Sequence, residues 1–229
     1  MNGEQRSARR CRIKFCGITT LDDAVAAASA GADYLGYNFV PASRRYLQPN
    51  AAQALCRQAD ERLAGDVLSV GVFQDATADA VVEALESCRL DVLQFHGAES
   101  AAYCAQFGKP YWKVIAMTGP DAFPAAAAAY PDAAALMLDA VSVAADGSSV
   151  SGGTGERFDA RWWPQSAAAP LVLAGGLDAD NVAAAVAMLQ PWCVDVASGV
   201  ARAGGEGAGV LKDAELMNRF CREVRSGGR

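Results

Sequence analysis

Residues 171–200, with the sequence LVLAGGLDADNVAAAVAMLQPWCVDVASGV, contain the unit that decides the fold. An apolar run at 171–174 ends in a glycine turn, and an alanine-rich helix is predicted over 179–189. A second apolar run follows at 193–196. Such runs, without polar alternation, are typical of strands buried on both faces of a parallel sheet. We therefore predict a strand–helix–strand unit with parallel strands.

The same pattern recurs along the rest of the chain. Further strands are predicted at 12–16, 34–39, 67–73, 92–95, 111–116 and 135–138. Further helices are predicted at about 20–30, 50–62, 77–87 and 100–107, in the alanine run near Ala125, weakly after Asp159, and at 211–224.

Eight strand–helix units in 229 residues predict an α/β protein with a single-domain (β/α)8 (TIM) barrel and a closed parallel sheet. We place the barrel at 12–226, after a loosely ordered N-terminal extension at 1–11. A doubly wound open sheet is the alternative fold. Its dinucleotide-binding version is disfavoured because no GxGxxG motif follows the first strand.

Charge and hydropathy exclude several classes of protein. The chain has 20 Lys and Arg against 26 Asp and Glu, and no basic cluster after the first dozen residues, so a nucleic-acid groove is not expected. Prolines and aspartates interrupt the longest apolar stretch, at about 122–145, so we expect no membrane span. The arginines in 1–12 precede no apolar segment, so we expect no secretory signal and a cytoplasmic protein.

The cysteine and histidine content argues against two kinds of stabilising or catalytic site. Seven cysteines with no CxxC motif make a disulfide framework improbable and favour a reducing compartment. His96 is the only histidine, which disfavours a catalytic zinc site. We expect neither a metal nor an organic cofactor.

Polar side chains cluster at the predicted carboxyl ends of the strands, where barrel enzymes carry their chemistry. A helix cap or a turn would explain any single one of them. Their convergence on one rim favours an active site. The residues concerned are Cys16, Asn38, Gln94, His96, Asp139 and Asp195.

Three glycine-bearing loops follow the last predicted barrel strands. They contain Gly153 and Gly155, Gly175 and Gly176, and Ser198 with Gly199. Glycine lets backbone N–H groups approach an anion closely, and the last two loops of such barrels commonly hold phosphate. We predict a phosphate site there.

Cys16 and Asp139 are the pair that could carry acid–base chemistry. Lys14, two residues before Cys16, should point into the barrel, and we favour a core lysine paired with an acid over a direct chemical role. His96 could donate to a ligand or be a satisfied rim histidine, and the second interpretation is favoured.

Taken together, the motifs resemble those of the phosphoribosylanthranilate isomerase family, in order, over nearly the whole chain past Arg12. The matching stretches are 14–19, 41–46, 71–73, 93–97, 136–139, 152–155 with 158–159, 173–177 with 181–182, and 194–200.

The resemblance implies an Amadori rearrangement of N-(5-phosphoribosyl)anthranilate, with Asp139 as general acid and Cys16 as general base. It also implies that Arg45 faces the anthranilate carboxylate and that Asp195 contacts the anthranilate side. Gln94 and His96 complete the expected contacts with this small phosphosugar substrate. The substrate nitrogen is the electron sink, so no cofactor is required. Both a monomer and a homodimer fit the sequence.

The chain departs from the family pattern at Phe15, Asp75, Ala197 and Ala201, where Ile, Asn, Ser and Glu are usual. Its glycine-rich passage at 203–213 is also longer than usual. Two alternative functions stay open. One is the histidine-pathway aldose–ketose isomerase, which carries Asp where Cys16 stands, and the other is a non-catalytic sugar-phosphate-binding barrel.

Overall fold

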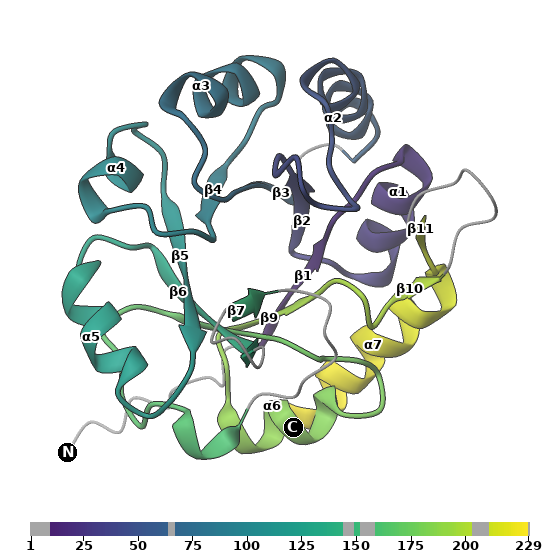
Figure 1. Cartoon of the computed structure of the whole chain (residues 1–229). Helices are drawn as coiled ribbons and strands as arrows, with labels where there is room; N and C mark the ends of the chain where they lie inside the picture. The colour runs from purple at the N-terminus through teal and green to yellow at the C-terminus, as the bar shows by residue number, and fades with distance from the viewer. Residues whose placement is uncertain (1–9, 64–66, 144–148, 152–158, 203–210, 229) are drawn as a thin grey trace, which may run out of the picture.

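The structure is a computed structural model that describes residues 10–63, 67–143, 149–151, 159–202 and 211–228. Eight of the described strands form a closed parallel barrel, because β5 pairs with β6 as well as with β4. The helices form a ring around it (Figure 1). The barrel strands, in sequence order, are β1 (Arg12–Cys16), β2 (Tyr34–Asn38), β3 (Leu68–Phe73), β4 (Val92–Phe95), β5 (Tyr111–Met117), β6 (Ala135–Val143), β8 (Leu171–Ala174) and β9 (Cys193–Val196). The predicted barrel is thus confirmed.

Seven described α-helices cover the outside of the strands. They are α1 (Leu21–Ala30), α2 (Pro49–Leu63), α3 (Ala78–Ser87), α4 (Ala101–Ala105), α5 (Ala122–Ala129), α6 (Val182–Leu189) and α7 (Ala214–Gly227). Local sequence fixes their ends. For example, the Thr20 side chain accepts a hydrogen bond from the Asp23 N–H at the start of α1, and Gly31 ends that helix in the left-handed conformation.

The connection between β6 and β8 holds the largest departure from the predicted elements. A short strand, β7 (Ser149–Ser151), pairs antiparallel with the end of β6. The weak helix predicted after Asp159 is a single 3-10 turn, η1 (Ala160–Trp162). This part of the helical ring therefore lacks an α-helix among the described residues.

Two predicted helices begin later than expected because polar side chains hold the preceding residues in other conformations. Leu211–Lys212 forms β11, which pairs antiparallel with β10 (Ala201–Arg202), and Asp213 then caps α7. Before α6, the Asp178 carboxylate accepts hydrogen bonds from the N–H groups of Asp180 and Asn181 and holds a turn.

The barrel interior is a packed core rather than a pore. Tyr34 and Trp112 lie near the amino ends of β2 and β5, and their rings meet each other and the ring of Trp192. Above them, smaller apolar side chains such as Val172 and Met137 fill the centre. Chemistry is therefore confined to the opposite end, where the strands finish.

One disulfide departs from the expectation drawn from the cysteine pattern. Cys56 on α2 and Cys88 at the end of α3 are joined, with their Cα atoms 5.5 Å apart. The two helices pack side by side on the outside of the barrel, which brings cysteines 32 residues apart together. Sequence spacing alone does not reveal this pair.

The described helices do not reach the combined length and hydropathy that a membrane span requires. The predicted domain limits stay a prediction, since most of the proposed extension at 1–11 lies outside the described residues.

Candidate active site

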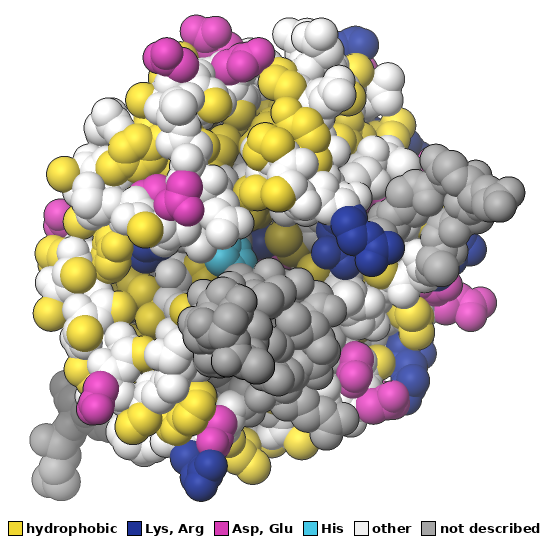
Figure 2. Space-filling view, viewed as in Figure 1, with side chains coloured by type: hydrophobic (Ala, Val, Ile, Leu, Met, Phe, Trp, Pro, Cys, Tyr) yellow, Lys and Arg dark blue, Asp and Glu magenta, His cyan; other side chains and the backbone are white. Residues whose placement is uncertain are grey.

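The carboxyl ends of the barrel strands face the viewer in Figures 1 and 2. Figure 2 shows a hollow near the centre of this face, with a histidine side chain at its edge and cationic side chains beside it. Apart from Gly153 and Gly155, the predicted site residues lie at the carboxyl ends of the barrel strands or in the loops that follow them.

Cys16, the last residue of β1, shares its surroundings with two buried charges. Lys14 is fully buried, and its Nζ lies 2.8 Å from Asp195 Oδ1 on the neighbouring strand β9. Burial lowers the pKa of Lys14, but the nearby Asp195 carboxylate and the Cys16 side chain outweigh it, so the net pKa is raised. Gly36 leaves room for this arrangement, since a Cβ there would lie 3.1 Å from both Cys16 Sγ and Lys14 Nζ. Lys14 is thus paired with an acid, as predicted.

Asp139 lies on β6 and is held between two neighbouring loops. Its carboxylate is almost fully buried, and Oδ2 lies 3.4 Å from His96 Nε2 at the end of β4. On the other side, a Cβ at Gly175 would lie 2.9 Å from Asp139 Oδ1 and 2.5 Å from the Ala140 Cβ. Gly175 also has a φ of +90°, so only glycine suits this approach. His96 therefore has a carboxylate neighbour on the rim, and its predicted contact with a substrate stays a prediction.

A buried ion pair that sequence analysis missed fixes the loop that carries His96. Lys113 on β5 donates to the Gly97 carbonyl at 2.6 Å, and its Nζ lies 3.3 Å from Glu99. The same carboxylate accepts hydrogen bonds from the N–H groups of Gly97 and Asp75. A lysine inside an apolar strand is the available signal, but its partner lies in the loop after the neighbouring strand β4, which sequence spacing does not reveal.

Gln94 offers an unsatisfied acceptor inside the barrel. Its neighbours Leu93 and Phe95 pack in the outer core, so the alternation of β4 directs Gln94 inward. The side chain is 1% exposed, and Oε1 has no hydrogen-bond partner among the described residues. Leaving a buried amide oxygen unpaired is costly. A ligand donor in the barrel mouth would satisfy it.

Arg45 lies against the turn that follows Cys16. A Cβ at Gly17 would come within 2.1 Å of Arg45 Cδ, so the side chain crosses directly over this glycine. Gly17 has a φ of +77°, which again favours glycine. The Nε atom of Arg45 is buried without a hydrogen-bond partner in the described structure.

The two glycine loops after β8 and β9 meet each other. Gly175 and Gly176 both have positive φ, and Gly199 packs so closely on Leu177 that a Cβ would lie 2.0 Å from its carbonyl oxygen. Ser198, beside Gly199, is exposed on the same turn. The two predicted phosphate-binding loops are therefore adjacent. Gly153 and Gly155, the third predicted loop, lie outside the described residues.

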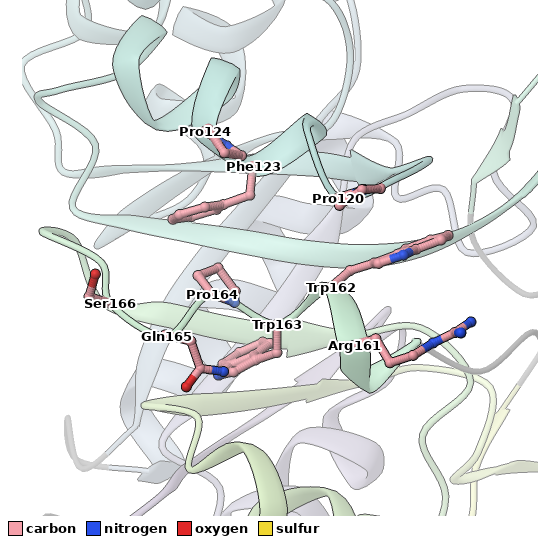
Figure 3. Close-up of a pocket in the computed structure, with 9 residues that line it drawn as sticks. All are labelled: Pro120, Phe123, Pro124, Arg161, Trp162, Trp163, Pro164, Gln165 and Ser166. Atoms are coloured by element: carbon pink, nitrogen blue, oxygen red, sulfur yellow. The ribbon is translucent and has the colours of Figure 1, made fainter.

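A separate cavity of about 300 Å³ lies away from the predicted site, between the start of α5 and η1 (Figure 3). None of the predicted site residues lines it. Its lining is mostly aromatic and proline side chains, namely Pro120, Phe123, Pro124, Arg161, Trp162, Trp163, Pro164, Gln165 and Ser166.

The described residues contain no cluster of three or more His, Cys, Asp or Glu side chains arranged to hold a metal ion. A closed parallel barrel with a thiol, a carboxylate and buried cations at the carboxyl ends of its strands defines the class of (β/α)8-barrel enzymes.

Comparison with known proteins identifies the family within that class. A family model described as N-(5'phosphoribosyl)anthranilate (PRA) isomerase matches residues 13–223. The N-(5'-phosphoribosyl)anthranilate isomerase of Geobacter sp. (strain M21) is 44% identical over 218 residues, covering 93% of this chain and 98% of that protein. The chain belongs to the phosphoribosylanthranilate isomerase family.

Solved structures of the family share the fold. The phosphoribosyl anthranilate isomerase of Thermus thermophilus superposes with a TM-score of 0.78 at 34% identity, covering 94% of this chain and 98% of that one. A second isomerase structure, in complex with reduced 1-(o-carboxyphenylamino)-1-deoxyribulose 5-phosphate, gives a TM-score of 0.73 at 26% identity, covering 96% and 100%.

Proposed function

We propose that this enzyme converts N-(5-phosphoribosyl)anthranilate to 1-(2-carboxyphenylamino)-1-deoxyribulose 5-phosphate in cytoplasmic tryptophan biosynthesis, with Asp139 as general acid and Cys16 as general base. One observation carries the proposal. The thiol and the carboxylate, 123 residues apart in sequence, lie on β1 and β6 of the same barrel. Both stand at the end of the barrel where the polar side chains gather.

The chemistry needs one proton delivered and one removed. Asp139 gives its proton to the ring oxygen of the furanose, the bond between that oxygen and C1 breaks, and the nitrogen lone pair forms an iminium ion. The iminium acidifies the proton on C2, which the Cys16 thiolate removes. The electrons of that C–H bond pass to the nitrogen and leave an enolamine, which tautomerises to the aminoketone product. Each electron pair stays within the substrate.

The surroundings of Cys16 support its role as base. Only a thiolate can accept the C2 proton efficiently, and the Lys14 ammonium is placed to stabilise that charge. Asp195 holds Lys14 in position through the 2.8 Å ion pair. The contact of Asp195 with the anthranilate side, expected from the resemblance, remains part of this proposal.

The remaining groups suit the other parts of the substrate. The glycine turns at 175–176 and 198–199 present backbone N–H groups for the phosphate, and we include Gly153 and Gly155 in this site. Arg45 suits the anthranilate carboxylate because a guanidinium binds a carboxylate through two parallel donors. Gln94 and His96 border the space between. We propose a small-molecule substrate only, with no nucleic acid or membrane, and a monomer or homodimer.

Complementation tests this function directly. A bacterial tryptophan auxotroph that lacks this single step should grow without tryptophan when it expresses the wild-type chain, and should fail to grow with Cys16→Ser. Failure of the well-expressed wild type to restore growth, in a strain rescued by a known isomerase, would overturn the proposal.

A further inference from the structure

Lys212 is a buried cation at the barrel mouth that the chemistry described above does not use. It ends β11, whose partner β10 follows closely after β9. Its backbone N–H lies 3.3 Å from Asp23 Oδ1 on α1, which holds the strand against the barrel. The side chain is 3% exposed, and Nζ donates to the Ala197 carbonyl at 2.7 Å.

This contact places the ammonium next to the end of β1. Phe15 pairs with Val196 in the parallel ladder between β1 and β9, so Cys16 and Ala197 follow as neighbours. Parallel strands lie about 4.8 Å apart, which brings Lys212 Nζ close to the turn after Cys16. Arg45 crosses the same turn. Both cations therefore lie near the end of β1, and the charge of Arg45 acts on Lys212.

The positive charge of the Lys212 ammonium is not neutralised by a carboxylate partner in the described structure. Burial lowers the pKa of Lys212 to about 8. The nearby side chains of Cys16, Asp195 and Asp23 oppose this shift, and the positive charge of Arg45 adds to it. Asp195 is engaged by Lys14, and Asp23 meets the backbone N–H of Lys212 rather than its ammonium.

Within the described residues, no carboxylate lies within 4.0 Å of Lys212 Nζ or of the Arg45 guanidinium. By contrast, the other two buried lysines, Lys14 and Lys113, each have a carboxylate partner. Two neighbouring cations repel each other at a cost that an anion between them would remove. This asymmetry indicates a site prepared for an anionic ligand.

We propose that Lys212 and Arg45 together bind the carboxylate of the anthranilate moiety, one oxygen facing each cation. This inference rests on the proposed function, which supplies a substrate with two anionic groups. The phosphate fits the glycine turns at the ends of β8 and β9. Lys212 Nζ meets Ala197 at the edge of the second of these turns, whereas Arg45 lies over Gly17 after β1. An anion that faces both cations therefore lies on the β1 side of the phosphate turns, and we assign the carboxylate to it.

Binding of two matched probes tests the assignment. The first is reduced 1-(o-carboxyphenylamino)-1-deoxyribulose 5-phosphate, and the second is the same reduced compound without its carboxyl group. Calorimetry at pH 7 should show that Lys212→Met binds the first probe about tenfold more weakly than the wild type does. Its affinity for the second probe should change less than twofold. Lys109→Met, at an exposed lysine, should match the wild type with both.

Three outcomes would overturn the inference. The first is equal weakening of Lys212→Met with both probes, which would assign Lys212 to the phosphate or to the fold. The second is no weakening with either probe. The third is that Lys212→Met keeps the wild-type preference for the probe with the carboxyl group. Lys212→Gln, with its thermal unfolding recorded, provides a second uncharged variant in case the first folds poorly. If the wild type binds neither probe, the proposed function itself fails, so the two failures are distinguishable.

Discussion

The buried Lys212 ammonium destabilises the folded protein, so the free energy of unfolding should depend on pH. Its pKa is about 8 when folded against 10.5 for an ordinary lysine, so the unfolded chain binds more protons between these values. The free energy of unfolding of the wild type should rise from pH 8 to 10.5, by up to about 3 kcal/mol relative to Lys212→Met.

Chemical denaturation of both proteins at pH 7 and pH 10 measures this difference. The variant retains every other titrating group, so comparison with it isolates Lys212. A difference in unfolding free energy between the two proteins that stays constant with pH would contradict the burial of an unbalanced ammonium.

Arg45 should act on binding rather than on folding. Its side chain lies over Gly17 at the rim without an ion pair to a described residue, so removing it breaks no structural salt bridge. We expect Arg45→Ala to raise KM about tenfold or more and to shift the unfolding midpoint by less than about 2 °C. Steady-state kinetics and thermal unfolding check this. A parallel loss of stability and activity would show a structural role.

Among the elements, the turn after β8 has the tightest link to the candidate acid. Gly175 and Gly108 both have positive φ, but a Cβ at Gly175 would strike Asp139 and Ala140 whereas one at Gly108 meets nothing within 4 Å. Both alanine variants should lose about 1 kcal/mol from backbone strain. Only Gly175→Ala should lose more stability and also lower kcat, because it displaces the Asp139 carboxylate.

Unfolding free energies and kcat of Gly175→Ala and Gly108→Ala separate the effect of backbone strain from that of the contact with Asp139. Equal behaviour of Gly175→Ala and Gly108→Ala would mean that the turn does not position Asp139. Since Gly108 ends a turn after α4, it provides the matched control within the same chain.

At the scale of elements, sequence patterns predicted most of the barrel but not its irregular connections. Apolar runs identify strands reliably here because both faces of each strand are buried. The sequence predicts a helix that begins at Leu211, but Leu211–Lys212 is a strand, because it pairs with Ala201–Arg202 in a tertiary contact. Propensity carries no information about such a partner.

At the scale of the whole molecule, sequence patterns predict local relations within the site but not contacts between distant parts of the chain. The alternation of β1 placed Lys14 beside Cys16 correctly, because that relation is local. The Lys113–Glu99 pair, the cation pair of Arg45 and Lys212, and the Cys56–Cys88 disulfide all join different strand–helix units. The first and third pairs join adjacent units, and the cation pair joins residues far apart in the chain, so in each case tertiary packing brings the partners together.

The strand order of the barrel places the proposed acid, base and phosphate-binding turns on different strands. Around the ring, β9 and β8 separate the strand of Cys16 from that of Asp139, and these two strands carry the glycine turns. A substrate held by its phosphate between them would present its ribose to both groups. In the proposed mechanism, Asp139 and Cys16 then act on different sides of one sugar.

The measurement that tests the proposed acid and base most directly is kcat of purified Cys16→Ser and Asp139→Asn with N-(5-phosphoribosyl)anthranilate. Each variant should lose at least about 100-fold in kcat, since each removes one proton-transfer group, while KM changes little. Cys221→Ser, at a buried free cysteine on α7, is the matched control and should keep wild-type kcat. Turnover near the wild-type rate in either site variant would contradict the assignment of acid and base.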